Sequence, residues 1–142
     1  MFKCILVPID VDQPNSWSQA IPVAVELSKL HTAELHFINV VPEFGMSIVG
    51  SFFPEGHERK MIDKAKDNLS KIISDQSLDA VSFKLHVAHG TIYEKIIAAA
   101  DAVKADLIVM TAHRPELSDY LLGPNAARIV RHAKQSVFVV RD

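Results

Sequence analysis

Five short, nearly continuous apolar segments recur along the chain, and they alternate with segments that carry apolar residues at helical spacing. Such runs of Val, Ile, Leu and Phe are typical of strands buried on both faces. The predicted strands span residues 2–9, 33–41, 82–90, 105–112 and 136–140. Strict alternation of strands and helices predicts an α/β fold with a parallel sheet, right-handed crossovers and helices on both faces.

Apolar residues three and four positions apart in the intervening segments predict amphipathic helices. These residues are Trp17, Ile21, Ala24 and Val25; Met61, Ala65, Leu69, Ile72 and Ile73; Ile96, Ile97, Ala100 and Val103; and Ile129, Val130 and Ala133. Pro22 predicts a first helix that starts later than Ser16 or is kinked, because proline beyond the first turn removes a backbone hydrogen bond. Thr91 and Glu94 form a capping-box pattern at the start of the third helix.

The composition of the chain limits the classes of function. Its 142 residues, 49% of them hydrophobic, fit one domain with a sizeable core. The formal net charge is -2 and basic residues alternate with acidic ones, so neither nucleic acid nor an anionic membrane is an expected partner. No apolar segment approaches the ~20 residues that span a bilayer, and no signal-peptide pattern is present, which predicts a cytoplasmic protein. The single Cys4 predicts a small buried hydrophobe.

The usual glycine fingerprints of nucleotide sites, GxGxxG and GxxxxGK[ST], do not occur in the sequence. Polar and small residues instead follow the predicted strands, and in a parallel sheet they converge on one edge. Asp10 follows the first strand, where its carboxylate can accept from a ribose hydroxyl or an adenine amino group, or cap the next segment. Asp12 is expected to be an exposed turn residue.

The stretch Gly123, Pro124, Asn125 opens the last predicted helix. Free N–H groups at a helix N-terminus favour an anion by about 0.3 to 2 kcal/mol. Pro124 has no N–H, so a phosphate here requires a side-chain donor from Asn125. The same residues also fit a turn followed by an N-cap, and both interpretations stay open. Arg114 is the basic residue best placed for phosphate, whereas His113 fits either a ligand contact or a structural one.

No pattern in the sequence indicates catalysis or a metal site. His86 and His89 lie three apart on a predicted strand, so their side chains point to opposite faces and indicate structural roles. No Ser-His-Asp or Cys-His arrangement stands out, and no catalytic residue is predicted. Residues 42–60 form a long apolar segment rich in Gly and Pro, which predicts a lid or a contact surface.

Four stretches carry a resemblance to a known family: "ILVPID", "LIVMTAHRP", "YLLGPNAARIVRHA" and "SVFVVR". Together they resemble the universal stress protein family over the whole chain, and most closely its F-type, the small single-domain enterobacterial members. The resemblance implies a single-domain Rossmann-like fold of the adenine nucleotide alpha hydrolase type. Its open, five-stranded parallel sheet has the order 3-2-1-4-5. It also implies a cytoplasmic stress-response function and, in one branch, ATP binding.

ATP-binding members of that family carry G-x2-G-x9-G-[ST] after the fourth strand. In this sequence Thr111 and Arg114 stand at the first two glycine positions and Pro124 at the hydroxyl position, so only Gly123 is retained. The F-type pattern itself has HRP in place of the glycine pair, and the resemblance therefore still implies nucleotide binding. Thr111, Arg114 and Asn125 then replace the missing groups.

The resemblance and the strand ends together predict an ATP site, with Mg as an optional companion and no metal site built from protein side chains. Adenine is expected near Asp10 and the backbone of Val40, and Ser136 is a candidate on the phosphate side. The predicted site comprises Pro8, Ile9, Asp10, Val40, Val41, Gly90, Thr111, Ala112, His113, Arg114, Gly123, Pro124, Asn125, Ser136 and Val137.

The leading hypothesis is a stress-response protein in which ATP modulates conformation or assembly. Family resemblance also implies a homodimer through the last strand, residues 136–140, with higher oligomers open. One alternative is a nucleotide-free interaction module that uses this dimer edge and the apolar segment 42–53. A second alternative is a slow ATPase, although the sequence indicates no residue that would act as the general base.

Overall fold

The computed structural model describes residues 1–42, 56–112 and 123–141. Its strands are β1 (Cys4–Pro8), β2 (Glu34–Pro42), β3 (Phe83–Gly90), β4 (Leu107–Ala112) and β5 (Ser136–Arg141). Its α-helices are α1 (Ala20–His31), α3 (His57–Ser74), α4 (Ile92–Ala102) and α5 (Gly123–His132), and a short 3-10 helix, η1 (Pro14–Ser16), precedes α1. Each predicted strand is present within two residues of its expected bounds.

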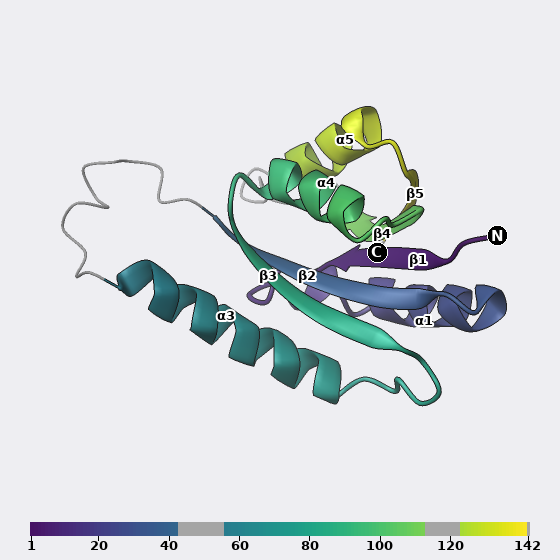
Figure 1. The fold of residues 1–142 in the computed structure, drawn as a ribbon, viewed down its shortest axis with the longest axis horizontal. Helices are drawn as coiled ribbons and strands as arrows, with labels where there is room; N and C mark the ends of the chain where they lie inside the picture. Colours follow the sequence, from purple (N-terminus) through teal and green to yellow (C-terminus); the bar gives the residue numbers. More distant parts are fainter. Residues whose placement is uncertain (43–55, 113–122, 142) are drawn as a thin grey trace.

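All five strands are parallel and lie in the order β3-β2-β1-β4-β5, as predicted. Helices α1 and α3 cover one face of the sheet, and α4 and α5 cover the other (Figure 1). The alternation of β2 divides the core between these faces: Leu35 and Phe37 pack with α1 and α3, while Ile38 and Val40 pack with α4 and α5. A three-layer α/β arrangement is therefore confirmed.

Two local predictions about helix starts have different outcomes. Helix α1 begins at Ala20, which leaves Pro22 in the first turn, where a missing N–H breaks no intrahelical bond. The later start is thus confirmed. Thr91 occupies the N-cap position of α4, but its side chain makes no capping hydrogen bond, and Glu94 instead accepts from the Tyr93 hydroxyl at 3.3 Å. The capping box is wrong, although the helix begins where it was expected.

The two histidines of β3 point to opposite faces of the sheet, as predicted. His86 stacks against His36 of β2, with ring centroids 5.0 Å apart. His89 Nδ1 lies 3.0 Å from the Glu58 carboxylate of α3. Both histidine side chains therefore have protein partners.

No helix in the described ranges is long and apolar enough to cross a membrane.

Candidate functional site

A cavity of about 690 Å³ lies at the carboxyl ends of the strands, in the size range of small-ligand pockets. The chain winds outward from β1 through β2 to β3 and then returns to the other side of β1 as β4. This reversal leaves the ends of β1 and β4 without a crossover above them, and ligands of open α/β sheets bind at such a point. The cavity is lined from both sides of the sheet, by α3 and by α4 and α5.

The turn after β1 holds Asp10 in place. The Asp10 N–H donates to Ser16 Oγ at 2.9 Å, and the Ser16 hydroxyl donates back to the Asp10 carbonyl oxygen at 3.0 Å. The Asp10 carboxylate also accepts from the Asp12 N–H at 3.0 Å. Asp10 therefore stabilises the turn and lines the cavity at once, and the two roles considered from sequence are compatible. Asp12 is exposed, as expected, but it also reaches the cavity.

The backbone of Val40 faces the cavity because β2 is longer than β1. In a parallel sheet, each residue directs both its N–H and its C=O to one neighbouring strand, and the next residue directs both to the strand on the other side. The Glu34 N–H donates to the Lys3 carbonyl oxygen, just before β1, and the Ile38 carbonyl oxygen accepts from the Ile9 N–H at 2.8 Å. The Leu35 N–H instead donates to the Ser82 carbonyl oxygen, just before β3. Even-numbered residues of β2 thus face β1. Beyond Ile9 the chain turns into η1, so the N–H and C=O of Val40 face the cavity that Val40 lines.

Thr111, at the end of β4, lines the cavity but is only 2% exposed. Its hydroxyl donates to the Ser16 carbonyl oxygen at 3.3 Å, which ties β4 to η1. A hydroxyl has a single proton, so toward a ligand this group acts as an acceptor. From the sequence, Thr111 is expected to offer its hydroxyl in place of a missing glycine, and the proton of that hydroxyl is donated to Ser16.

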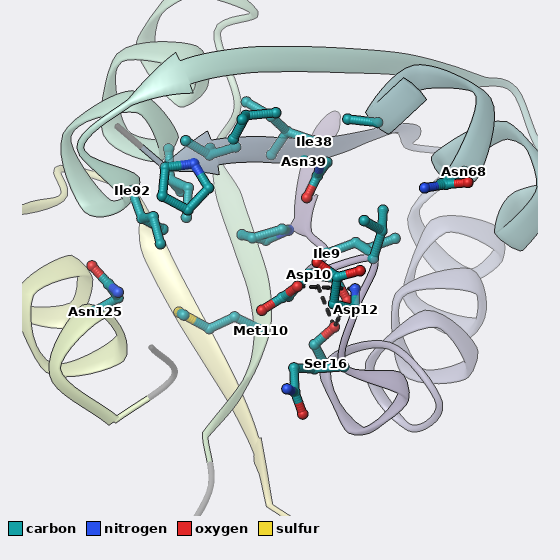
Figure 2. A pocket seen from close by; sticks show the side chains of 18 of the residues that line it. Ile9, Asp10, Asp12, Ser16, Ile38, Asn39, Asn68, Ile92, Met110 and Asn125 are labelled. Atoms are coloured by element: carbon teal, nitrogen blue, oxygen red, sulfur yellow. Dashed lines mark hydrogen bonds between the residues drawn. The ribbon is translucent and has the colours of Figure 1, made fainter. Parts of the chain in front are cut away.

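Helix α5 presents its first turn to the same cavity. Asn125 is half-buried there and lines the wall, whereas Pro124 is exposed. Figure 2 shows Asn125 at one end of the cavity and Asn68 of α3 at the opposite end, with Asp10 between them. A helix N-terminus and a carboxamide donor therefore meet at one end.

The α3 wall was not anticipated from sequence. Met61, Lys64, Ala65 and Asn68 line the cavity at helical spacing. The sequence predicts Met61 and Ala65 only as members of an apolar helix face. Whether one end of that face borders a cavity depends on how α3 crosses the sheet, and no local pattern records this crossing.

The structure brings about half of the predicted site residues into the cavity lining and places two of them, Ser136 and Val137, at the opposite edge of the sheet. Lining the cavity are Pro8, Ile9, Asp10, Val40, Val41, Thr111 and Asn125. Gly90 and Ala112 are at the same edge of the sheet and Pro124 is at the start of α5, but these three are not among the described residues that line the cavity. Gly123 is the first residue of α5. His113 and Arg114 lie outside the described residues.

Ser136 and Val137 require a correction. Ser136 begins β5 and pairs with Leu107, the first residue of β4, and Val137 pairs with Ile108. All strands are parallel, so these residues lie at the amino ends of the strands, opposite the cavity. The sequence assignment of Ser136 and Val137 to the nucleotide site does not hold in this fold.

Fold and cavity together define an open, parallel α/β protein with a cavity at the switch point of its sheet. Over residues 1–141 the sequence matches the model of the Universal stress protein family. The chain therefore belongs to the universal stress protein family. It is 28% identical over 143 residues to Universal stress protein G of Shigella flexneri and of Escherichia coli O157:H7, covering 99% of this chain and 100% of each relative.

Three solved structures have a similar fold. The hypothetical protein MJ0577 superposes with a TM-score of 0.73 at 22% identity, covering 100% of this chain and 97% of that one. UspA from Lactobacillus plantarum gives 0.68 at 23% identity, with 98% and 97% covered. A universal stress protein in complex with cAMP gives 0.60 at 22% identity, with 99% and 97% covered. The family and the fold expected from sequence are confirmed, and the finer likeness to F-type members stays a prediction.

Proposed function

We propose that the cavity binds an adenine nucleotide, with ATP as the principal ligand, and that binding modulates conformation or assembly in a stress response. The observation that carries the proposal is the direction of the Val40 backbone. Its N–H and C=O face the cavity beyond the end of β1. An adjacent donor and acceptor match the adenine edge, where N1 accepts and the N6 amino group donates.

The same backbone pair disfavours guanine. Guanine carries an N1–H donor and an O6 acceptor at these two positions, so each backbone group of Val40 meets a group of its own kind. Buried polar groups left without a complementary partner cost about 1–3 kcal/mol each. Selection for adenine therefore needs no special side chain, which fits a sequence without a glycine fingerprint.

Charge gives the nucleotide a direction in the cavity. The carboxylates of Asp10 and Asp12 follow β1 and repel phosphate, but their oxygens can accept from ribose hydroxyls. The N-terminus of α5, with Asn125 on the wall, lies at one end of the cavity and favours an anion. Base and ribose then lie toward β1 and β2, with the phosphates toward α5.

Membership of the family supports the proposal, since one universal stress protein of similar fold is known in complex with cAMP. Mg²⁺, if it takes part, is expected to accompany the phosphates. Calorimetric titration with ATP, GTP, cAMP and adenosine at near-physiological salt tests the function directly. We expect ATP to bind at least tenfold more tightly than GTP. Absence of heat at millimolar ATP contradicts nucleotide binding, and product release above background indicates an ATPase instead.

A second candidate function, an interaction module that pairs through β5, is favoured by one separate observation. Strand β5 is an edge of the sheet, and Phe138 on it keeps 44% of its surface exposed. Edge strands with apolar side chains pair readily with another copy. Sedimentation should show a homodimer that Phe138→Lys weakens. Phe83→Lys, on the opposite edge strand and 41% exposed, is the matched control. Equal effects of both changes contradict a β5 interface.

A further inference from the structure

Asn39, which precedes Val40 on β2, is an unusual residue in the wall of the cavity. Its side chain is part of the lining although the residue is only 5% exposed. Within residues 1–42, 56–112 and 123–141, no hydrogen bond joins its carboxamide to another group. Figure 2 shows the side chain turned from β2 toward Ile9 and Asp10. Buried carboxamides normally have a protein partner, so a group of this kind in a cavity wall indicates ligand binding.

The position of Asn39 follows from strand geometry. Successive side chains of a strand point to opposite faces, so Asn39 lies on the α1 and α3 side of the sheet together with Phe37. Its own backbone belongs to the pairing with β3, opposite Val87. The carboxamide is therefore the one part of Asn39 that turns to the cavity, directly before the Val40 groups proposed to bind the base.

The order of atoms along β2 determines which part of the base comes next to Asn39. Within Val40 the N–H precedes the C=O along the chain. When adenine N1 accepts from this N–H and its amino group donates to this C=O, the ring edge formed by C2 and N3 points back along the strand. That edge lies on the side of Asn39. Of its two atoms, N3 is the hydrogen-bond acceptor, and a carboxamide NH₂ is a donor.

We propose that Asn39 is an adenine-binding residue whose carboxamide donates a hydrogen bond to N3 of the base. This inference rests on the proposed function and adds a side-chain contact to the backbone readout by Val40. Its chemistry is separate from that readout, because N3 is not part of the edge that N1 and the amino group form. The two contacts can therefore be tested one at a time with modified nucleotides.

The test compares ATP with 3-deaza-ATP, in which a C–H replaces N3. Both nucleotides are titrated into the wild-type protein, into Asn39→Leu, which keeps the number and branching of the side-chain heavy atoms, and into Asn15→Leu as control. Asn15 is exposed in η1 and does not line the cavity. Wild-type protein and the Asn15 variant should bind ATP about three- to tenfold more tightly than 3-deaza-ATP. Asn39→Leu should bind both nucleotides equally, at about the weaker affinity.

Two outcomes overturn the inference while the proposed function stands. These are ATP binding with no preference over 3-deaza-ATP in the wild type, or an equal weakening of both nucleotides by Asn39→Leu. If the wild type binds no ATP at millimolar concentration, the proposed function fails and the inference fails with it. Thermal melting establishes that each variant is folded. The wild-type comparison of the two nucleotides remains decisive even if Asn39→Leu does not fold.

Discussion

His36 Nδ1 of β2 lies 2.7 Å from His86 Nε2 of β3, and His36 Nε2 lies 2.6 Å from the Glu34 carboxylate. A hydrogen bond between two imidazoles needs an N–H on one ring and a lone pair on the other, so protonation of both rings breaks it. Burial, followed by the charges of His36 and Lys84, holds the pKa of His86 below its ordinary value of 6.5. The three linked groups therefore form a proton-sensitive contact between neighbouring strands.

This contact should make stability depend on pH. The folded-state pKa of His86 is depressed, so the unfolded chain binds the proton more readily. Its contribution to stability is complete above pH 6.5 and is lost as the pH falls from there through the folded-state pKa. Urea denaturation between pH 8 and 5 should show the free energy of unfolding falling with acid. For one proton the slope stays below about 1.4 kcal/mol per pH unit.

His86→Gln should flatten this dependence between pH 6.5 and 5. His132→Gln, at an exposed site on α5, should retain it. The hydrogen bond from His36 lowers the pKa of Glu34 below 4.5, which acts with the same sign at lower pH. An unchanged slope in His86→Gln contradicts the assignment of the acid sensitivity to the His36–His86 contact.

Gly90→Ala should destabilise the protein without changing nucleotide affinity. Gly90 ends β3 with φ of +141°, a conformation that side chains with a Cβ rarely adopt, and an added Cβ lies 2.7 Å from Lys95 Cε. The lysine end can move, but the backbone strain remains and costs about 1–3 kcal/mol. Thermal melting measures the loss, and ATP titration of the folded variant should match the wild type. Weaker ATP binding at unchanged stability supports the nucleotide contact predicted from sequence.

Cys4 should react slowly with alkylating agents. Burial first, and then the carboxylates of Asp106 and Glu34, raise the pKa of its thiol to about 11. At pH 8 the thiolate fraction is then on the order of a hundredfold below that of a free cysteine. Iodoacetamide labelling followed by mass spectrometry measures the rate, and Asp106→Asn should accelerate it. A rate equal to that of a model peptide contradicts the shielding.

Asn125→Ala should weaken ATP binding by about three- to tenfold and leave adenosine binding nearly unchanged, because Asn125 lies at the proposed phosphate end of the cavity. Arg114→Ala, proposed from sequence alone, should show the same selectivity. Calorimetry with both ligands separates the two ends of the site. Equal losses for ATP and adenosine indicate that Asn125 shapes the cavity instead of holding phosphate.

The sequence correctly predicted the parallel sheet and the opposite faces of His86 and His89, since both follow from periodicity along short segments. It missed His36 as the partner of His86, although both residues are visible in the sequence. Their contact depends on the register of β2 against β3, which pairs Ile38 with His86. Register between strands that are about 50 residues apart leaves no local pattern.

The candidate site also combines features that the sequence predicts with features that only the tertiary structure decides. The alternation of strands and helices alone puts the carboxyl ends of the strands at one edge of the sheet, so the sequence predicts that Asp10, Val40 and Asn125 lie near one another. Only the tertiary structure decided that Ser136 lies at the far edge, that α3 forms a wall of the cavity, and that β1 stops short of β2. The N–H and C=O of Val40 point to the side of β1, and they face the cavity because β1 ends before it reaches Val40. A strand exposes these groups only where its neighbour ends.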